Sequence, residues 1–529
     1  MQRAAPASLH QQSFDLLVVG GGIQGAAIAR EAALHELKVL LVDAHDFAAG
    51  TSSRSSRLIH GGLRYLREGH FALVREALQE RERLLRLAPH LVWPQAMLMP
   101  FFADGGGNRA LSWLGVQAYH WLARGSSLPG PTTLSAAAAL RAFPGLRRQG
   151  LRGAIKFYDA ATVDGRLTLA NIEDAARAGA VVVNHCALSG LTPQGALRLC
   201  DRLDGSEYLV NAAQVVNAAG PRADAVRRLL GQGGADLIRT TRGSHLVLPP
   251  RADSLALAAF LPDHRIQFVI PHPDGTICGT TDVDQPPEAE EPAVPAADVD
   301  YVLQARAWLL DPPPRREDLR HAWCGLRALP AGNGPPGALN REAFVVSETL
   351  PRGTLHTIVG GKLTTHRALA ERTVKQIFST LPAGSPTRAR PLPGGDGPAR
   401  PDDPLWSRHG SDAIAVRRLA EEEPAWAAPL CPHRPTLGAE LVYALRQQAA
   451  VSFSDVMLRR LWHTQGPCLT EQCLRAAHAL FVRERRWVVD DDFAEAANAL
   501  RTAVVGVSGG VGLWKEQAAA DSVHHHCQR

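Results

Sequence analysis

Several features are scarce in this chain of 529 residues, and each scarcity excludes a class of protein. No run of about 18 apolar residues occurs, so the sequence predicts no membrane-spanning helix. The first residues, MQRAAPASLHQQS, contain no apolar core, and we therefore expect no secretory signal. The net charge of only +5 does not favour a nucleic-acid partner.

Closely spaced cysteine pairs are also missing. The eight cysteines are scattered, and none of them forms a Cys-x-x-Cys pair. This spacing favours neither a zinc ribbon nor a disulfide framework, so the sequence predicts no metal site and suits a reducing cytoplasmic compartment. The terminal residues His524–Cys527 could bind stray metal, although a local tail is the simpler interpretation.

Lysine is scarce, whereas arginine is plentiful. The five lysines stand at positions 38, 156, 362, 375 and 515. Arginine evidently serves wherever a generic positive charge is enough. A lysine in an unusual context, such as Lys362 directly after Gly360 and Gly361, is therefore a candidate for a specific role.

What the chain does have is length, which predicts two or three domains, and one strong motif. Residues Phe14–Asp43 form the pattern of a buried strand, a glycine turn, a helix and a second buried strand. Gly20 permits the tight turn, Gly22 lets the backbone approach a pyrophosphate, and Gly25 lets helix and strand pack closely. Asp43 would accept hydrogen bonds from a ribose. An ordinary sheet with a glycine turn is the alternative, but the order of all these parts favours a dinucleotide site.

A cluster of hydroxyl side chains follows this motif, comprising Thr51, Ser52, Ser53, Ser55 and Ser56. Such residues commonly cap a helix N-terminus. They can equally contact a phosphate, because both roles use the free N–H groups of a helix end. Gly61 and Gly62 come next and allow the backbone to approach a bulky group closely.

Regular patterns divide the next part of the chain. Helices are expected over 72–87 and 167–180, strands at 181–183 and 213–220, a turn-rich β excursion over 190–205, and a less regular insertion over 95–160. The strand at 213–220 ends in Ala218, Ala219 and Gly220. We place these small residues against the dinucleotide, where larger side chains would clash.

Alternating patterns then predict a second, antiparallel sheet and thus a second domain. The β-like segments are 242–249, 266–271, 276–281 and 343–346, with Pro-rich loops over 285–297 and 329–340. Residues 381–404 are dense in Pro and Gly and are typical of a linker. Residues 405–515 have helical patterns and predict a third domain.

The chain returns to the first domain at Thr357–Gly361, a strand that runs into a second glycine turn. Lys362–Thr365 then begins a helix whose inner face carries Ala370, Val374, Ile377 and Phe378. Two strand–glycine–helix units in one domain suit a cofactor long enough to span it. The positive end of the second helix would favour the negative charge of a reduced flavin ring.

Three separated motifs carry a resemblance to a known family. They are VVGGGIQGAAIAREAA, TSSRSSRLIHGGLRYL and VGGKLTTHRALAE, with RGSHLVLP, CGTTDV and WCGLRALP between the last two. The chain resembles the FAD-dependent, quinone-linked aerobic glycerol-3-phosphate dehydrogenases from about Phe14 to Ile377, and more weakly beyond. The resemblance implies an α/β fold with a Rossmann-like FAD-binding domain of the glutathione-reductase type, an antiparallel-sheet substrate domain and a helical C-terminal domain.

The resemblance also implies boundaries and an activity. The expected FAD-binding domain comprises 14–90, 161–245 and 345–380, the substrate domain 91–160 and 246–344, the linker 381–404, and the helical domain 405–515. The implied reaction oxidises sn-glycerol 3-phosphate to dihydroxyacetone phosphate, with hydride passing from C2 to flavin N5 and electrons passing to a membrane quinone. The family pattern is a homodimer attached to the inner face of the cytoplasmic membrane.

Site residues follow from the same resemblance. The expected FAD contacts are Gly20, Gly22, Ile23, Gln24, Gly25, Asp43, Thr51, Ser52, Ser53, His60, Gly61, Gly62, Ala219, Gly220, Gly361, Lys362, Leu363 and Thr364. The expected substrate contacts are Arg64, Tyr65, Thr281, Arg327, Arg341 and Lys362, the last lying also near the flavin N1/O2 edge. His245 is the candidate base for the substrate hydroxyl, with His60 as its rival. The structural alternatives are a satisfied core histidine for each and a surface salt bridge for the arginines.

The sequence departs from the family pattern at four positions. Asp43 stands where Glu is usual, Ala328 where Pro is expected, Gly165 where an acidic or larger residue is expected, and His366 where Tyr is usual. None of these changes removes a charge that the chemistry needs. The motifs leave the electron acceptor open, so a glycerol-3-phosphate oxidase that uses oxygen is the main alternative. An amine or 2-hydroxy-acid oxidoreductase and a non-catalytic flavin-binding interaction protein are the others.

Overall fold

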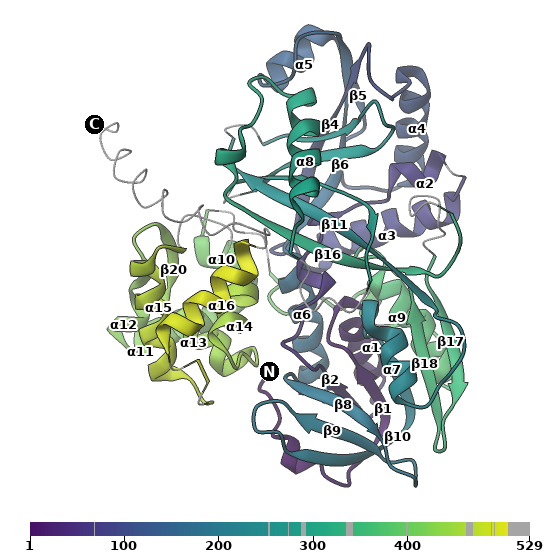
Figure 1. Ribbon diagram of the computed structural model, residues 1–529, viewed down its shortest axis with the longest axis vertical. Helices are drawn as coiled ribbons and strands as arrows, with labels where there is room; N and C mark the ends of the chain where they lie inside the picture. The colour runs from purple at the N-terminus through teal and green to yellow at the C-terminus, as the bar shows by residue number, and fades with distance from the viewer. Residues whose placement is uncertain are drawn as a thin grey trace.

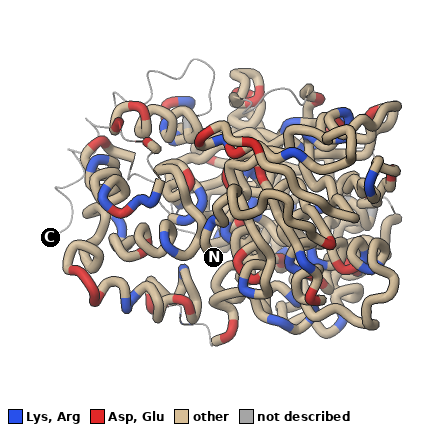
Figure 2. Tube along the Cα trace, turned by 90° about the horizontal axis from the view of Figure 1, so that it is seen from below, with Lys and Arg blue, Asp and Glu red and all other residues tan. Residues whose placement is uncertain are grey.

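The structure is a computed structural model. It describes residues 1–67, 69–251, 254–272, 275–286, 293–334, 342–397, 400, 402–461, 469–487, 489–490 and 492–505. Figure 1 shows three parts: a sheet with its helices around β1 and β10, a second sheet around β4 and β11, and the C-terminal helices to one side. Basic and acidic residues are interspersed along the trace (Figure 2), as the small net charge leads one to expect.

The first sheet is mainly parallel and contains the predicted dinucleotide motif. Its strand order is β17 (Phe344–Thr349), β18 (Thr354–Val359), β10 (Glu207–Asn217), β1 (Ser13–Val19), β2 (Val39–Val42) and β7 (Val181–Val183). The hairpin of β8 (Cys186–Leu191) and β9 (Leu197–Asp201) joins β10. Strands β1 and β2 are almost wholly buried because the sheet is covered on both faces.

Alternate residues of β1 serve the two faces of this sheet. Leu16 and Val18 pack with α1 (Ile23–Leu34), α6 (Asp164–Arg177) and α9 (His366–Ile377) in one apolar core. Leu17 and Val19 pack with the β8–β9 hairpin in another. Helix α1 lies between α6 and α9, so the glycine turn before α1 is fixed from both sides.

The second sheet is mainly antiparallel. Its order is β15 (Val283–Asp284), β11 (Ile238–Leu248), β14 (Gly275–Gly279), β13 (Ile266–His272), β12 (Ala256–Phe260), β4 (Val92–Phe102), β6 (Leu151–Thr162) and β3 (Leu58–Ile59). Strand β16 (His321–Pro330) pairs with β11, and β5 (Thr132–Leu134) with β6. Helices α5 (Ala136–Ala142) and α8 (Ala296–Leu309) cover one face. Helices α2 (Leu63–Arg67), α3 (Phe71–Leu87) and α4 (Arg109–Leu122) pack together beside this sheet (Figure 1).

One predicted strand belongs to the other sheet. The prediction that 343–346 joins the antiparallel sheet is wrong, because β17 pairs with β18 in the first sheet. The short turn after Thr349 returns the chain directly alongside β17, and this local hairpin determines the pairing. The predicted insertion 95–160 is more regular than expected, because the paired strands β4 and β6 of the second sheet lie at its two ends. The predicted domain boundary at residue 245 falls inside β11.

The C-terminal part is helical as predicted, with one small hairpin. It contains α10 (Pro404–His409), α11 (Ala413–Glu422), α12 (Pro424–Ala427), α13 (Gly438–Gln447), α14 (Phe453–Asp455), α15 (Glu471–Glu484) and α16 (Phe493–Val505), with strands β19 (Pro429–Cys431) and β20 (Arg434–Leu437). The stretch 506–515 of the predicted domain lies outside the described residues. In the described part of the chain, no helix combines the length and apolar character that crossing a membrane requires.

Candidate active site

A cavity of about 770 Å³ opens where the parallel strands of the first sheet end. Its lining follows β1 and β2, then the segments after β10 and β18. Residues 49–60 and strands β11 and β16 close it from the second sheet. The carboxyl edge of a parallel sheet is the usual binding edge of such folds. The cavity volume lies in the range typical of sites for small molecules and cofactors.

The first glycine turn has the strained, close-packed geometry that its sequence predicts. Gly20 has a φ of +106°, and a Cβ on Gly25 would lie 1.9 Å from the carbonyl oxygen of Gly20. Any side chain at Gly25 would therefore separate α1 from the turn. The Asp43 carboxylate accepts hydrogen bonds from the amides of Gly21 (2.6 Å) and His45 (2.9 Å), which binds β2 to the same turn. Burial raises the pKa of the Asp43 carboxyl to about 6, against the opposing effect of these two bonds.

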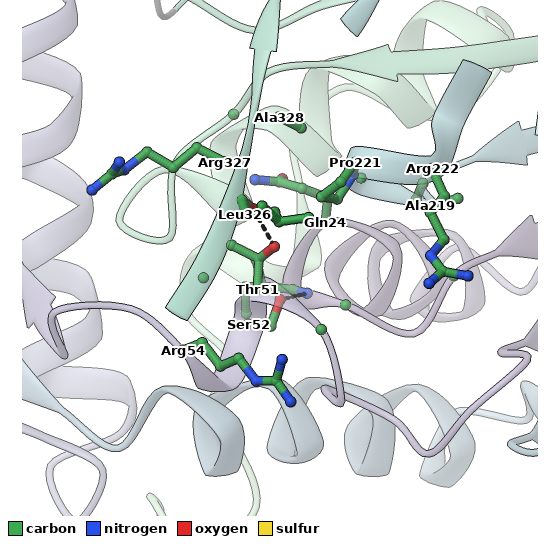
Figure 3. A pocket seen from close by; sticks show the side chains of 18 of the residues that line it. Gln24, Thr51, Ser52, Arg54, Ala219, Pro221, Arg222, Leu326, Arg327 and Ala328 are labelled. Carbon is green, nitrogen blue, oxygen red and sulfur yellow. Dashed lines mark hydrogen bonds between the residues drawn. The ribbon is translucent and has the colours of Figure 1, made fainter. Parts of the chain in front are cut away.

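The side chains of the hydroxyl cluster make different contacts. Ser52 accepts a hydrogen bond from the amide of Ile23 (2.8 Å), so it caps the first turn of α1 from a distant segment. Thr51 donates to the carbonyl of Leu326 (2.5 Å), a bond visible in Figure 3. Ser55 donates to the Asp164 carboxylate at 2.7 Å. These contacts join the first sheet, the second sheet and α6 around the cavity.

The second glycine turn meets the first. Gly360 and Gly361 have φ values of +75° and +104°, and the Gln24 side-chain amide donates to the carbonyl of Lys362 at 3.4 Å. Helix α9 begins at His366, four residues later than the sequence predicts, because Lys362–Thr365 form a turn that faces the cavity. The two units that the sequence placed in one domain thus share one site.

A polar group gathers where this turn approaches the second sheet. The Lys362 ammonium lies 3.5 Å from the centre of the Tyr65 ring, a cation–π contact. Thr364 exchanges hydrogen bonds with the backbone of His60, at 3.1 and 3.2 Å. Lys362, Tyr65, His60 and Thr364 all line the cavity.

His245 and Arg327 line the same cavity from β11 and β16. The His245 ring is 3% exposed, stacks on Trp323 with 5.4 Å between ring centres, and places Nε2 2.8 Å from the Ser56 hydroxyl. Burial, and next the positive charges of Arg327 and Arg57, lower the pKa of His245 to about 3. The imidazole is therefore neutral at pH 7 and has the form that accepts a proton.

The Arg327 guanidinium is held by four protein acceptors. They are the Thr280 hydroxyl (2.8 Å), the Thr281 carbonyl (3.0 Å), the Asp282 carboxylate (3.1 Å) and the Arg242 carbonyl (3.3 Å). Gly243 makes room for it, since a Cβ there would lie 2.2 Å from Arg327 Nη2. The charge of Arg327 is thus fixed in position before any ligand arrives.

Comparisons with known proteins identify the family of the chain. The model of the family described as FAD dependent oxidoreductase matches residues 15–372, which include both glycine turns. The chain belongs to the FAD-dependent oxidoreductase family. Within the family it is 36% identical over 515 residues to a glycerol-3-phosphate dehydrogenase of Mycobacterium leprae, covering 92% of this chain and 87% of that relative. It is 32% identical to the human mitochondrial glycerol-3-phosphate dehydrogenase, covering 91% and 71%.

Solved structures show the same fold. A Bacillus halodurans glycerol-3-phosphate dehydrogenase complexed with FAD matches with a TM-score of 0.75 and 27% identity, covering 94% of this chain and 96% of that one. A Mycoplasma pneumoniae L-alpha-glycerophosphate oxidase with FAD bound matches with a TM-score of 0.55 over 72% of this chain, and at 18% identity it shows the fold alone.

FAD is the cofactor of this oxidoreductase, and the chain's own residues fit it. Gly20 and Gly22 leave backbone exposed to the cavity at the N-terminus of α1, where a pyrophosphate binds. Asp43 could accept hydrogen bonds from a ribose, and the neighbouring Cys186–Leu188 segment offers apolar surface for an adenine. At the other end, Lys362 and His245 both line the cavity, and Lys362 supplies positive charge there. When bound, FAD supplies a two-electron acceptor at this end.

Several predicted site residues are not among those that line the cavity. Thr281 is 2% exposed, and its hydroxyl accepts from the Ser244 amide and donates to Asp298, so it supports Arg327 through its carbonyl. Gly25, Ser53, Gly61 and Gly62 also do not line the cavity. Gly61 instead donates its amide to the Tyr119 hydroxyl at 2.7 Å.

Two predicted phosphate ligands fall outside the description. Arg341 lies outside the described residues, as does the side chain of Arg64. The remaining predicted residues, Ile23, Gln24, Thr51, Ser52, Ala219, Gly220, Gly361 and Leu363, line the cavity.

The structure adds residues that the sequence reasoning did not select. Arg54 and Arg222 line the cavity, and Figure 3 shows them on two sides of the group formed by Gln24, Thr51 and Ser52, with Arg327 on a third. Ser56, which already belongs to the predicted hydroxyl cluster, is the hydrogen-bond partner of His245. The signal for Arg54 and Ser56 was their place inside the motif TSSRSSR. No local pattern marked Arg222.

Proposed function

We propose that this oxidoreductase is a glycerol-3-phosphate dehydrogenase, which converts sn-glycerol 3-phosphate to dihydroxyacetone phosphate. The observation that carries the proposal is a neutral, buried His245 beside a pre-positioned Arg327 at the cofactor cavity. A secondary alcohol with a dianionic phosphate needs both a proton acceptor and a cation. The names of the relatives in M. leprae and in human mitochondria support the same substrate.

The proposed roles balance the reaction. Hydride leaves C2 for flavin N5, and the hydroxyl proton passes to Nε2 of His245, so the alcohol becomes a ketone. The phosphate binds beside Arg327, whose fixed guanidinium supplies positive charge. Lys362 lies at the turn between cofactor and substrate and stabilises negative charge there. Burial is the main cause of the low pKa of His245, and the phosphate would offset the additional lowering by Arg327, so substrate binding makes the imidazole a stronger base.

Anaerobic titration tests the reaction. The purified yellow protein should lose its oxidised-flavin absorbance when glycerol 3-phosphate is added, and glycine or lactate should leave the absorbance unchanged. Bleaching by an amino acid or a hydroxy acid instead would assign a different substrate. Failure of every phosphorylated polyol to bleach the flavin would favour a non-catalytic role.

The electron acceptor of the proposal is a membrane quinone. The alternative, oxygen, is suggested by the fold shared with the M. pneumoniae oxidase. Reoxidation of the substrate-reduced enzyme distinguishes them: a soluble quinone analogue should restore the absorbance much faster than air-saturated buffer does. Rapid stoichiometric peroxide release in air would identify an oxidase.

A phospholipid surface is the proposed docking partner of helix α4. Leu111, Leu114 and Trp121 lie on one stripe of this helix and are 57%, 65% and 66% exposed, whereas Val116 and Tyr119 on the opposite stripe are buried. The segment 108–124 contains arginines at 109 and 124 and no acidic residue. An apolar stripe flanked by cations suits the boundary of an anionic bilayer.

Vesicle sedimentation tests this surface. Leu114→Glu with Trp121→Glu should abolish binding to vesicles that contain phosphatidylglycerol, while flavin reduction stays normal. The matched control is Ile414→Glu, which places the same charge on an exposed apolar residue of α11. Equal sedimentation of both variants would remove α4 from the proposal.

A further inference from the structure

Two cysteines and a histidine gather in the C-terminal helical part, and none of them lines the cofactor cavity. One ligand atom from each of Cys431, His433 and Cys473 lies within 4.8 Å of the other two. The Cys473 sulfur is 3.4 Å from Nδ1 of His433. We propose that these three side chains bind a thiophilic divalent cation of the Zn²⁺ class.

Local structure brings the three residues together. Cys431 ends β19 and pairs with Arg434 of β20, so Pro432 and His433 form the two-residue turn of a hairpin. Cys473 lies in the first turn of α15, where the Thr470 cap accepts a hydrogen bond from its amide at 3.4 Å. Strand β19 packs against α15, which places the hairpin tip over the start of the helix.

The donor set and the spacing suit zinc. Thiolate and imidazole are the ligands that Zn²⁺ prefers, and ordinary Zn–S and Zn–N bonds in a tetrahedron place S and N about 3.6 Å apart. The observed separation of 3.4 Å needs only a small adjustment. Both cysteines are 4% exposed, whereas His433 is exposed. The exposed histidine gives a path of entry and leaves the fourth position to solvent.

Metal binding at this site would involve the loss of protons. A bound cation would replace the thiol protons, which are released to solvent. The site would then fasten the β19–β20 hairpin to α15, a structural role independent of the flavin.

A second cluster of possible metal ligands differs from this one because arginines already pair with it. Asp46, His185 and Asp455 also place their ligand atoms within 4.8 Å of one another. Here Arg459 and Arg460 already contact the Asp46 carboxylate, and Arg459 also pairs with Asp455. Positive charge is thus supplied by the protein, and this cluster is an ion-pair network rather than a metal site.

Metal analysis of the full-length holoenzyme tests the proposal. Protein expressed with added zinc and passed over a chelating resin should retain about one zinc ion per chain. Cys473→Ser and His433→Gln should lose it while keeping flavin and its reduction by substrate. The matched control Cys200→Ser, on β9, should retain it. The histidines near the C-terminus are present in all four proteins, so any metal that they hold cancels.

Cobalt substitution gives a second readout that does not depend on any variant folding. Co²⁺ bound by two thiolates should add d–d bands in the red, beyond the flavin absorption, and Zn²⁺ should displace them. Absence of bound metal in the wild type, equal metal in wild type and Cys473→Ser, or a mass lower by two hydrogen atoms with a Cys431–Cys473 cross-linked peptide would each overturn the proposal.

Discussion

Arg327 acts through position as much as through charge. Its guanidinium is held by acceptors from 280–282 and from β11, so little side-chain entropy is lost when a phosphate binds. The neighbouring Asp282 offsets part of its charge at 3.1 Å. A dianionic ligand would still be favoured, since Arg54 and Lys362 also line the cavity.

We predict that Arg327→Ala raises KM for glycerol 3-phosphate by about 10- to 100-fold, because charge-assisted hydrogen bonds contribute about 1.5–3 kcal/mol. FAD should remain bound. Steady-state kinetics with a flavin absorbance spectrum checks both expectations. Arg239→Ala is the control, because Arg239 of β11 pairs with Asp284 of β15 and does not line the cavity. An unchanged KM would exclude Arg327 from the substrate site.

His245 leads to a prediction about pH. Its pKa of about 3 means that the free enzyme keeps this imidazole neutral throughout the physiological range. The profile of kcat/KM, which reports the free enzyme, should therefore show no acid limb from His245 between pH 5.5 and 8, roughly the range around an ordinary histidine pKa. His245→Asn should lower kcat by about 10²- to 10⁴-fold.

The coupling between the two residues offers a further check on the same assignment. Arg327 lowers the pKa of His245, so its removal should move any acid limb upward, toward the ordinary histidine value. A limb near neutral pH in the wild type that disappears in His245→Asn would contradict the buried, neutral state. Full turnover of His245→Asn at pH 7 would exclude the residue as base.

The turn between β1 and α1 requires glycine at position 25. We predict that Gly25→Ala purifies without FAD, because the new Cβ would lie 1.9 Å from the Gly20 carbonyl oxygen and would separate α1 from the turn. Absorbance of the purified protein measures the bound flavin. Gly115→Ala is the control, since a Cβ there meets nothing within 4 Å. Normal flavin content in Gly25→Ala would show that the turn can relax.

The strands and helices that could be predicted from sequence are those whose signal is local. Buried runs such as Leu16–Val19 and the glycine after them identify a strand and turn without knowledge of distant residues. The position of β17 and the start of α9 were not predictable in this way. The position of β17 depends on its hairpin partner, β18. The start of α9 depends on the turn before it, which accepts a hydrogen bond from Gln24.

The same limit applied to the site. Gly20, Asp43 and Lys362 could be predicted because each occurs in a motif with a mechanical reason. The bonds from Ser52 to α1, from Ser56 to His245 and from Thr51 to Leu326 join segments far apart in the chain. Which hydroxyl caps a helix and which orients a histidine therefore depends on tertiary structure.

Ion pairs to buried carboxylates fasten the C-terminal helices and the linker to the part that contains the first sheet. Asp46 follows β2 and pairs with Arg459 and Arg460, which lie just after α14, and Arg460 is among the largest fully buried side chains. The predicted linker is also anchored, because Arg390 pairs with Asp174 of α6 at 3.0 Å. The C-terminal helices are therefore packed as part of one body with the first sheet.

Buried neutral histidines make the stability of this body sensitive to acid. His245 and His321 have their pKa lowered to about 3, and His366 to about 4, in each case mainly by burial. The unfolded chain binds protons at these residues below about pH 6.5, whereas the folded chain does not. Their contribution is therefore complete above that pH and falls as the pH drops toward the folded values.

We predict a loss of about 4 kcal/mol between pH 7 and 5.5 from these three residues together, at about 1.4 kcal/mol each. His185 acts in the opposite sense, because Asp455 raises its pKa, and it reduces the loss slightly. Thermal unfolding across this pH range measures the slope. His321→Phe, within the apolar cluster around Trp323, should reduce the total loss over this pH range by about 1.4 kcal/mol, since one protonation is removed. The control is His70→Gln, which replaces an exposed histidine and should leave the slope unchanged. An unchanged slope in His321→Phe would mean that other groups cause the loss of stability in acid.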